Sequence, residues 1–310
     1  MEETRKIGNA FIHLGATFHY PIAKMIEEHF IKYIHPECIL DINGCTDIKS
    51  ATGFQYIPYH MERVWPMGVN KPPKKFEQYL VDIWNNAYEI WDFNIENYEY
   101  FHTKFPNKRW KFVPFRYATY FEQFQLCTRA PRYDIGFTGT IDTPTRFDIL
   151  HSLTHMHNIP GSDIASTLRK LEFKIINHSV DRYKYDDMHD CKYILDLPHW
   201  GVEQTCNMVR IWESLCINSP MIVYDPYNTT KRYFSDCVIT IGDLKTDEIY
   251  EAIFDNIWNA VHVEPPFSVA DKYKELTYSD EDYKLYCISI LQDFRRVSGI
   301  DIPNSVLLDM

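Results

Sequence analysis

Two alternating periodicities constrain the fold of this chain more than any other feature. Short apolar runs, such as residues 109–115 and 133–139, alternate with longer segments whose apolar residues recur at helical spacing, such as 20–34 and 73–87. Strands that alternate with helices build parallel sheets covered by helices, whereas a sandwich or a bundle shows a single periodicity. The sequence therefore predicts an open α/β fold.

The alternating units fall into two sets. The first set ends near residue 125, and a second set of full strand and helix units begins at residue 133. A polar stretch at 278–299 then predicts a C-terminal helix. With 310 residues, the length also favours two cores over one. We expect two α/β domains in tandem.

Composition excludes several classes of protein. The net charge of -11 argues against nucleic acid as a partner, because binding to a phosphate backbone needs a basic face. The eight cysteines include no CxxC pair, so neither a zinc cage nor a disulfide framework is expected. No run approaches the roughly 18 apolar residues of a membrane span. We expect a soluble, cytoplasmic protein.

The segment after the strand at 133–138 suits an anionic ligand, since ligands of open α/β sheets bind beyond the carboxyl ends of the strands. Gly139 and Thr140 are small, and the helix that Thr143 would cap offers its positive end. Arg146, in the first turn, is placed to reach a diphosphate. A simple turn at Gly139 is the alternative, since neither GxGxxG nor GxxxxGK[ST] is present.

A second candidate segment follows the strand at 192–198. His199 lies at the strand exit, and the helix expected from Val202 carries Asn207, Arg210 and Glu213 on or beside its polar stripe. A nucleotide would place its phosphates at the start of this helix and its ribose against a helix carboxylate. A solvated pair of Arg210 and Glu213 is the plain alternative.

These segments resemble a known family. The runs "YDIGFTGTIDTPTRFDILHSL" and "YILDLPHWGVEQTCNMVRIWESLCINSPMIVYD" resemble the C-terminal half of GT-B glycosyltransferases, and "EIWDFNIENYEYFHTKFPNKRWKFVPF" resembles the end of their first domain. The resemblance is strongest to compact enzymes of capsular polysaccharide pathways and of large DNA viruses that glycosylate their capsids. It implies two Rossmann-like domains facing across a cleft, an acceptor-binding domain at 1–126 and a nucleotide-sugar-binding domain at 127–275. A helix at 276–310 would pack back toward the first domain.

The resemblance also implies an activity and a set of donor contacts. A sugar would pass from a nucleotide diphosphate sugar, a UDP-sugar being favoured and UDP-xylose a guess, to a glycan or glycoprotein acceptor. Gly139 and Thr140 would face the diphosphate, Arg210 would neutralise it, and Glu213 would accept the ribose hydroxyls. Asn207 stands where many relatives carry a glutamate, so its contact is open.

Neither a metal nor a cofactor is expected, because these enzymes usually lack a metal-binding DxD. Arg146, Arg210 and a helix dipole would stabilise the departing nucleotide diphosphate instead. A viral member would act in the cytoplasm of its host cell.

An inverting reaction would need a base near the acceptor hydroxyl. The loop that holds His19 resembles the catalytic histidine loop of plant natural-product glucosyltransferases, and Asp47 would orient this histidine or act alone. A retaining reaction needs no such base. A non-catalytic nucleotide-binding or sugar-binding protein of the same fold is the alternative function. An NAD-dependent oxidoreductase is disfavoured by the absent glycine fingerprint.

Two further segments are assigned as loops. The acidic and histidine-containing stretch at 181–190 lacks the spacing of a metal site, so we expect a solvated loop. The aromatic-rich stretch at 53–68 shows no clear periodicity, and a loop, as a lid or a packing insertion, is expected there.

Overall fold

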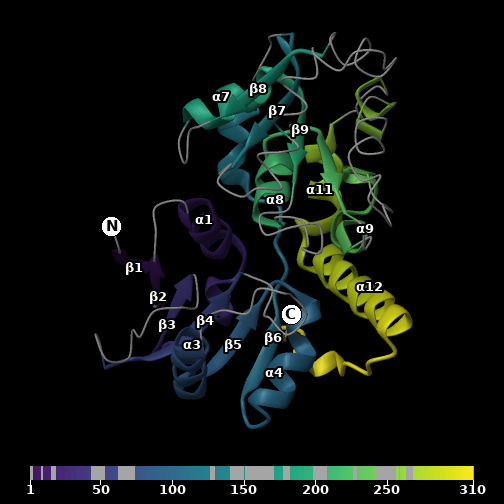
Figure 1. The fold of residues 1–310 in the computed structure, drawn as a ribbon. Helices are drawn as coiled ribbons and strands as arrows, with labels where there is room; N and C mark the ends of the chain where they lie inside the picture. Colours follow the sequence, from purple (N-terminus) through teal and green to yellow (C-terminus); the bar gives the residue numbers. More distant parts are fainter. Residues whose placement is uncertain are drawn as a thin grey trace. The chain divides into compact units, whose positions relative to one another are not determined.

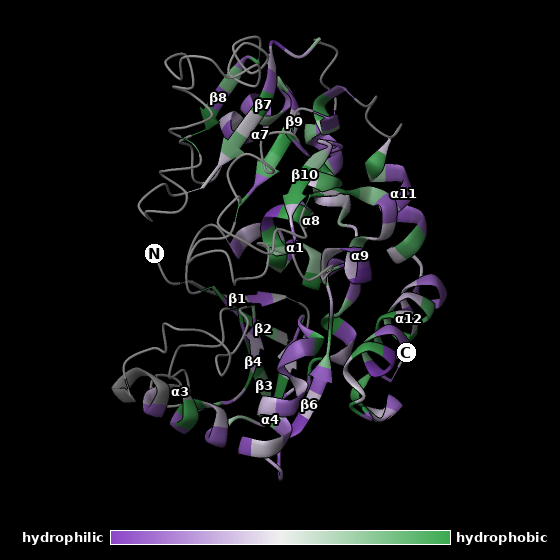
Figure 2. Cartoon of the chain, turned by 45° about the vertical axis from the view of Figure 1, so that its right-hand side comes forward, coloured by the Kyte–Doolittle hydropathy of each residue, from purple (hydrophilic) through white to green (hydrophobic). Residues whose placement is uncertain are grey.

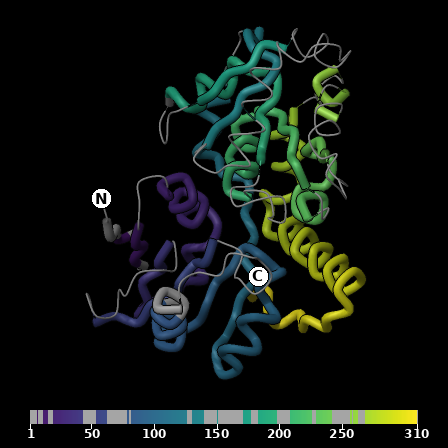
Figure 3. The backbone as a smooth tube through the Cα atoms, viewed as in Figure 1, coloured from purple at the N-terminus to yellow at the C-terminus, as the bar shows by residue number. Residues whose placement is uncertain are grey.

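The computed structural model divides the chain into two compact units (Figure 1). Unit 1 comprises Met1–Tyr120 and Glu275–Met310, and unit 2 comprises Phe121–Lys274, a path that Figure 3 traces. The expected boundaries at 126 and 275 lie close to these. The residues that the structure describes are 3–7, 10–14, 19–42, 53–61, 74–125, 130–139, 150, 171–176, 182–197, 208–225, 229–241, 256–257, 259–262 and 268–309.

Unit 1 contains a six-stranded sheet in the order β1-β2-β3-β4-β5-β6. The strands from β2 to β6 are parallel, and only β1 is antiparallel to its neighbour. Strands β1 and β2 pair with each other, with Ile7 opposite Ala10. The strands are β1 (Glu3–Ile7), β2 (Ala10–Leu14), β3 (Cys38–Ile42), β4 (Gln55–His60), β5 (Glu89–Asp92) and β6 (Arg109–Phe112).

Strand β4 corrects the expectation of a loop at 53–68. Five of its six residues, all but Gln55, are buried, and it lies between β3 and β5. A strand buried on both faces shows no alternation of polar and apolar residues, which is why periodicity failed to reveal it. Pro58 added to the difficulty, because proline is rare inside a sheet.

Helices cover both faces of the sheet in unit 1. On one face, Tyr56 donates to the carbonyl of Ile83 in α3, and His60 packs against Trp84. Trp91 points to the opposite face, where it contacts Phe30 at the end of α1. The helices are α1 (Tyr20–His29), α3 (Lys74–Asn86), α4 (Tyr98–Lys104) and α12 (Asp280–Ser298), with 3-10 turns at Ile31–Tyr33, Ile95–Asn97, Thr119–Phe124 and Asn304–Val306, while α11 (Val269–Thr277) leads from unit 2 back to unit 1.

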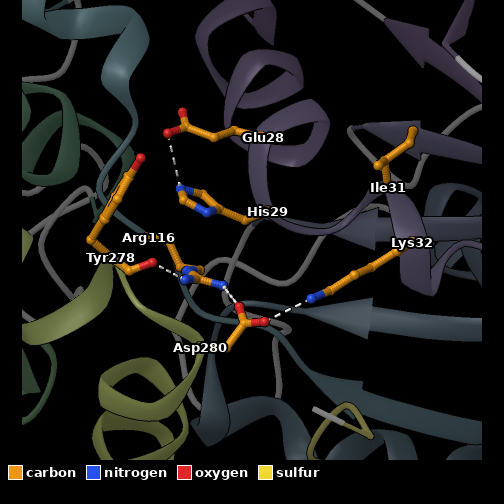
Figure 4. Close-up of a pocket in the computed structure, with 7 residues that line it drawn as sticks. All are labelled: Glu28, His29, Ile31, Lys32, Arg116, Tyr278 and Asp280. Carbon is orange, nitrogen blue, oxygen red and sulfur yellow. Dashed lines mark hydrogen bonds and ion pairs between the residues drawn. The ribbon is translucent and has the colours of Figure 1, made fainter.

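The C-terminal helix forms as the sequence predicts. The side chain of Ser279 caps α12 by accepting from the backbone N–H of Asp282, and Gly299 ends it at a φ of 73°. The buried Arg116 guanidinium donates to the carbonyl of Thr277. It also donates to the carbonyl of Tyr278 and to the Asp280 carboxylate, as Figure 4 shows. These bonds fix the returning chain to unit 1. Arg116, Tyr278 and Asp280 line a polar pocket of about 280 Å³. The other lining residues are Glu28, His29, Ile31 and Lys32.

Unit 2 contains a five-stranded parallel sheet in the order β8-β7-β9-β10-β11. The chain runs outward from β7 to β8, then returns past β7 to β9. Strands β7 and β9 are therefore neighbours whose connections leave in opposite directions, which defines a topological switch point. The strands are β7 (Tyr133–Thr138), β8 (Phe173–Ile176), β9 (Cys191–Asp196), β10 (Met221–Tyr224) and β11 (Ile239–Ile241).

The core of unit 2 lies on one face of this sheet, where Phe137, Leu195 and Tyr224 join a buried apolar cluster. The apolar character of β9 and β10 is visible in Figure 2. Helices α7 and α8 pack on the sheet at β8, β9 and β10. The helices described in unit 2 include α7 (Arg182–His189), α8 (Met208–Cys216) and α9 (Thr229–Phe234), the last followed by a 3-10 turn at Ser235–Cys237.

Helix α7 corrects the expectation of a solvated loop at 181–190. Tyr185 and Met188 stand three residues apart and are both buried, so one side of this mostly polar segment faces the protein. Helix α9 lies between β10 and β11. The two strands are parallel and need such a crossover. The predicted α/β class is confirmed by the two sheets, and the cleft between domains stays a prediction.

Candidate functional site

The switch point of unit 2 brings together residues that are distant in the sequence. Thr138 ends β7 and Gly139 follows it, Asp196 ends β9, and Arg210 lies in α8. Because β7 and β9 are parallel neighbours, their carboxyl ends meet at one edge of the sheet. This edge is where ligands of open α/β sheets bind.

The Arg210 guanidinium is held at these strand ends. Its Nη1 donates to Oδ1 of Asp196, and its Cζ lies 5.6 Å from the centre of the Phe137 ring. Arg210 is 8% exposed and Asp196 is 0% exposed. A buried charge needs a partner, and here each group provides it for the other.

Gly139 makes room for this guanidinium. A Cβ atom at position 139 would lie 2.5 Å from Nη2 of Arg210, and the φ of 139° is one that other residues rarely adopt. The glycine is therefore required by the position of Arg210 as well as by the turn. The sequence paired Gly139 with Arg210 at one site, and the structure brings the two together.

This arrangement is suited to an anion. A guanidinium is planar, stays charged at every physiological pH and can present two N–H groups to a phosphate at once. The flanking glycine lets a ligand approach the backbone closely. Among the described residues, Gly139 and Arg210 are thus the two that fit the expected diphosphate contact.

Glu213 has a different environment from the one expected. Its Oε2 lies 2.5 Å from Nζ of Lys184, and its Oε1 accepts from the Tyr185 hydroxyl at 3.4 Å. Lys184 and Glu213 are 8% and 6% exposed, so this is a buried ion pair between α7 and α8. The alternative of a solvated Arg210 and Glu213 pair is wrong, because both side chains are buried. The contact of Glu213 with the ribose stays a prediction. A ribose hydroxyl would have to compete with Lys184 for this carboxylate.

The other predicted site residues divide into two groups. His19 is the N-cap residue of α1, is 2% exposed, and burial lowers its pKa to about 4. It is therefore neutral at physiological pH. The positions that lie outside the described residues are Asp47, Thr140, Arg146, His199 and Asn207.

Asp196 and Lys184 are two site residues that were not predicted from the sequence. Asp196 ends an apolar strand in "YILDLP", a position that the rule for strand exits could have flagged. Lys184 was hidden in the segment assigned as a loop. Nothing in the sequence alone relates either residue to α8, since both contacts depend on how the helices pack.

Unit 1 also holds a buried polar cluster at strand ends. His60 ends β4 and Asp92 ends β5, and their side chains approach to 3.3 Å between Nδ1 and Oδ2. Asn97 donates to Oδ2 of Asp92 at 2.9 Å, and the Asn94 backbone N–H donates to Oδ1 at 2.8 Å. Complete burial raises the pKa of Asp92, an effect that the interactions with His60, Asn94 and Asn97 oppose.

No group of three or more His, Cys, Asp or Glu side chains in the described part of the chain is arranged to hold a metal ion. None of the helices in that part has both the length and the apolar character needed to cross a bilayer.

Comparison with known proteins gives likenesses in structure and none in sequence. No family model and no curated protein sequence matches the chain. TarM is similar in structure, with a TM-score of 0.49 and 12% identity over 82% of this chain. The chain spans 54% of the length of TarM. A likeness at this level says nothing about activity, so the side chains at the switch point must carry the functional proposal.

Proposed function

We propose that this protein is a glycosyltransferase that uses a nucleotide diphosphate sugar and needs no metal. Unit 2 would bind the donor at its switch point, and unit 1 would bind a glycan or glycoprotein acceptor. A UDP-sugar is the favoured donor, and UDP-xylose is among those to be tested. The observation that carries the proposal is the Arg210 guanidinium held beside Gly139 at the carboxyl ends of β7 and β9.

The proposed reaction defines what the site must do. The bond between the anomeric carbon and the diphosphate oxygen breaks, and its electron pair stays with the nucleotide diphosphate. The acceptor oxygen bonds to the anomeric carbon and loses its proton to a base or to solvent. Negative charge thus develops on the diphosphate, and Arg210 is positioned to stabilise it with a charge that needs no metal.

The base for an inverting reaction has three candidates. The resemblance implies His19 or Asp47. His60 is a further candidate, because Asp92 and Asn97 contact its Nδ1 and would orient the ring; at 5% exposure it would, like His19, have to become accessible to the acceptor. Replacement by glutamine of His19 and His60 in turn, with donor binding measured beside turnover, distinguishes a base from a structural histidine.

The burial of His19 favours a second candidate function. A histidine that is 2% exposed and has a pKa of about 4 is poorly suited to take a proton from a bound acceptor at neutral pH. A binding protein of the same fold, with a donor site in unit 2 and no transfer, agrees with this observation. Donor binding without sugar transfer to any acceptor would support it.

A thermal-shift panel tests the proposed function directly. Nucleotide diphosphates and their sugars are added without metal to the wild type, to Arg210→Ala and to Arg210→Lys. We expect one nucleotide family to raise the Tm of the wild type, with a smaller shift for Arg210→Lys and none for Arg210→Ala. NAD should have no effect. A well-folded wild type that none of the nucleotides stabilises would contradict the proposal.

A further inference from the structure

Asp196 adds to the switch point a negative charge that the proposed donor site does not use. Its carboxylate is fully buried and accepts from Nη1 of Arg210, the group proposed to bind the diphosphate. We propose that Asp196 is a positioning residue that also weakens the binding of the nucleotide diphosphate, by offsetting the charge of Arg210. The inference deepens the proposed function and rests on it.

The positioning effect follows from the contacts of the guanidinium. Asp196 fixes Nη1, the ring of Phe137 lies below Cζ, and the backbone of Gly139 lies against Nη2. An arginine side chain loses rotamer freedom when it is ordered. Because Asp196 holds the guanidinium in place within the protein, an anion that binds to it meets a group that is already ordered.

The charge effect follows from the same geometry. A carboxylate bonded to one nitrogen of the guanidinium lies within one guanidinium width of any anion bound to another nitrogen. At roughly 6 Å and an effective dielectric constant of about 20, two negative charges repel strongly enough to change a dissociation constant on the order of 100-fold. Complete burial of Asp196 keeps solvent from screening this repulsion.

The expected benefit concerns the release of the product. Transfer of the sugar leaves a nucleoside diphosphate that carries more negative charge than the donor did. An arginine without a counter-charge would bind this product more tightly than the donor, and product release limits many enzymes. The Asp196 carboxylate lowers the affinity for both, and lowers it more for the product with its greater charge.

Isothermal titration of UDP and GDP without metal tests the proposal. Asp196→Asn keeps an oxygen that accepts from Nη1 but removes the charge, so we expect the nucleotide that the wild type binds to bind at least 10-fold more tightly. Asp196→Ala removes the acceptor as well and should bind more weakly than Asp196→Asn. The free UDP or GDP should gain more affinity from Asp196→Asn than the corresponding sugar nucleotide gains.

Asp190→Asn is the matched control. Asp190 precedes β9 at the opposite end of the strand, where Arg132 and Lys174 contact it, and its replacement changes the net charge equally. We expect the dissociation constant of the nucleotide from Asp190→Asn to stay within twofold of that from the wild type. Equal tightening by Asp190→Asn would mean that overall charge is responsible, and this would overturn the proposal.

The remaining outcomes are separable. If the wild type binds UDP or GDP and Asp196→Asn binds it equally or more weakly, the inference is overturned while the proposed function stands. If the wild type binds neither, the proposed function itself fails. Should Asp196→Asn not fold, Asp196→Ser, which keeps a hydroxyl oxygen as acceptor and removes the charge while Arg210 stays in place, is measured instead. It should also bind at least 10-fold more tightly than the wild type, and equal or weaker binding overturns the inference.

Discussion

The Nη1 atom of Arg210 donates to Oδ1 of Asp196 at the carboxyl ends of two neighbouring parallel strands. Fourteen positions separate these residues in the sequence, and the first lies in a helix while the second ends a strand. Their contact places a buried positive charge where an α/β sheet binds its ligand. Four predictions follow from this pair and from the other buried polar groups.

Gly139→Ala should damage the site more than an ordinary glycine substitution. The new Cβ would lie 2.5 Å from Nη2 of Arg210, and the φ of 139° strains any residue other than glycine. We expect a stability loss of about 1–3 kcal/mol in denaturant unfolding and loss of nucleotide binding. Gly299→Ala, at a φ of 73° with nothing within 4 Å, is the control: it should lose about 1 kcal/mol and keep binding. Unchanged nucleotide binding in Gly139→Ala would contradict the site.

Glu213→Gln should destabilise unit 2, because it leaves the buried Lys184 ammonium without its counter-charge. Breaking a buried ion pair in this way costs about 3–5 kcal/mol, whereas replacing both partners with apolar residues is often neutral. Lys184→Met with Glu213→Leu should therefore recover much of the loss in urea unfolding. Glu27→Gln in the partly exposed Lys24 and Glu27 pair should change stability by less than about 1 kcal/mol. A loss of donor affinity in Glu213→Gln at unchanged stability would instead identify a ribose contact.

Arg116 and Lys32 both contact Asp280, but they should differ in importance. The Arg116 side chain is 1% exposed and also donates to two carbonyls, whereas that of Lys32 is 56% exposed. We expect Arg116→Met to lose about 1–3 kcal/mol, since it removes the donor that the carbonyls of Thr277 and Tyr278 share. Lys32→Met should lose less than about 1 kcal/mol. Equal losses in the two variants would show that Arg116 does not fix the C-terminal segment.

Acid should destabilise unit 1 through His29. Burial, followed by the nearby Arg116 charge, lowers the pKa of this histidine to about 4 from an unfolded value near 6.5. The folded state thus binds fewer protons, so the stabilising contribution is complete above pH 6.5 and is lost as the pH falls to about 4. The loss amounts to about 3 kcal/mol. Burial also lowers the pKa of His19 to about 4, so this histidine should likewise destabilise the folded state in acid.

Urea midpoints between pH 7.5 and 4 measure this effect. The glutamine in His29→Gln can still donate to the carbonyl of Tyr117, which His29 Nε2 contacts at 2.7 Å, but it does not titrate. We expect its stability to fall less steeply with acid than that of the wild type, and the double variant with His19→Gln to fall less steeply again. Parallel pH profiles for the wild type and His29→Gln would refute the assignment.

Elements with a strong local signal were predictable from the sequence. Helix α12 has a serine cap, a long amphipathic stretch and a terminal glycine, and each acts within a few residues. Elements whose signal depends on burial were not. Strand β4 contains a proline and shows no alternation, because other elements cover both of its faces. Helix α7 is polar except for the residues that packing buries.

The candidate site divides in the same way. The sequence by itself determined the α/β class, the glycine after a strand, and an arginine on a helix that follows another strand, because these depend on local periodicity and on residue type. Only the tertiary structure decided that β7 and β9 are neighbours, that Arg210 contacts Asp196, and that Glu213 faces Lys184. Strand order and helix packing join residues far apart in the chain, and a buried charge takes whichever partner the packing brings within reach.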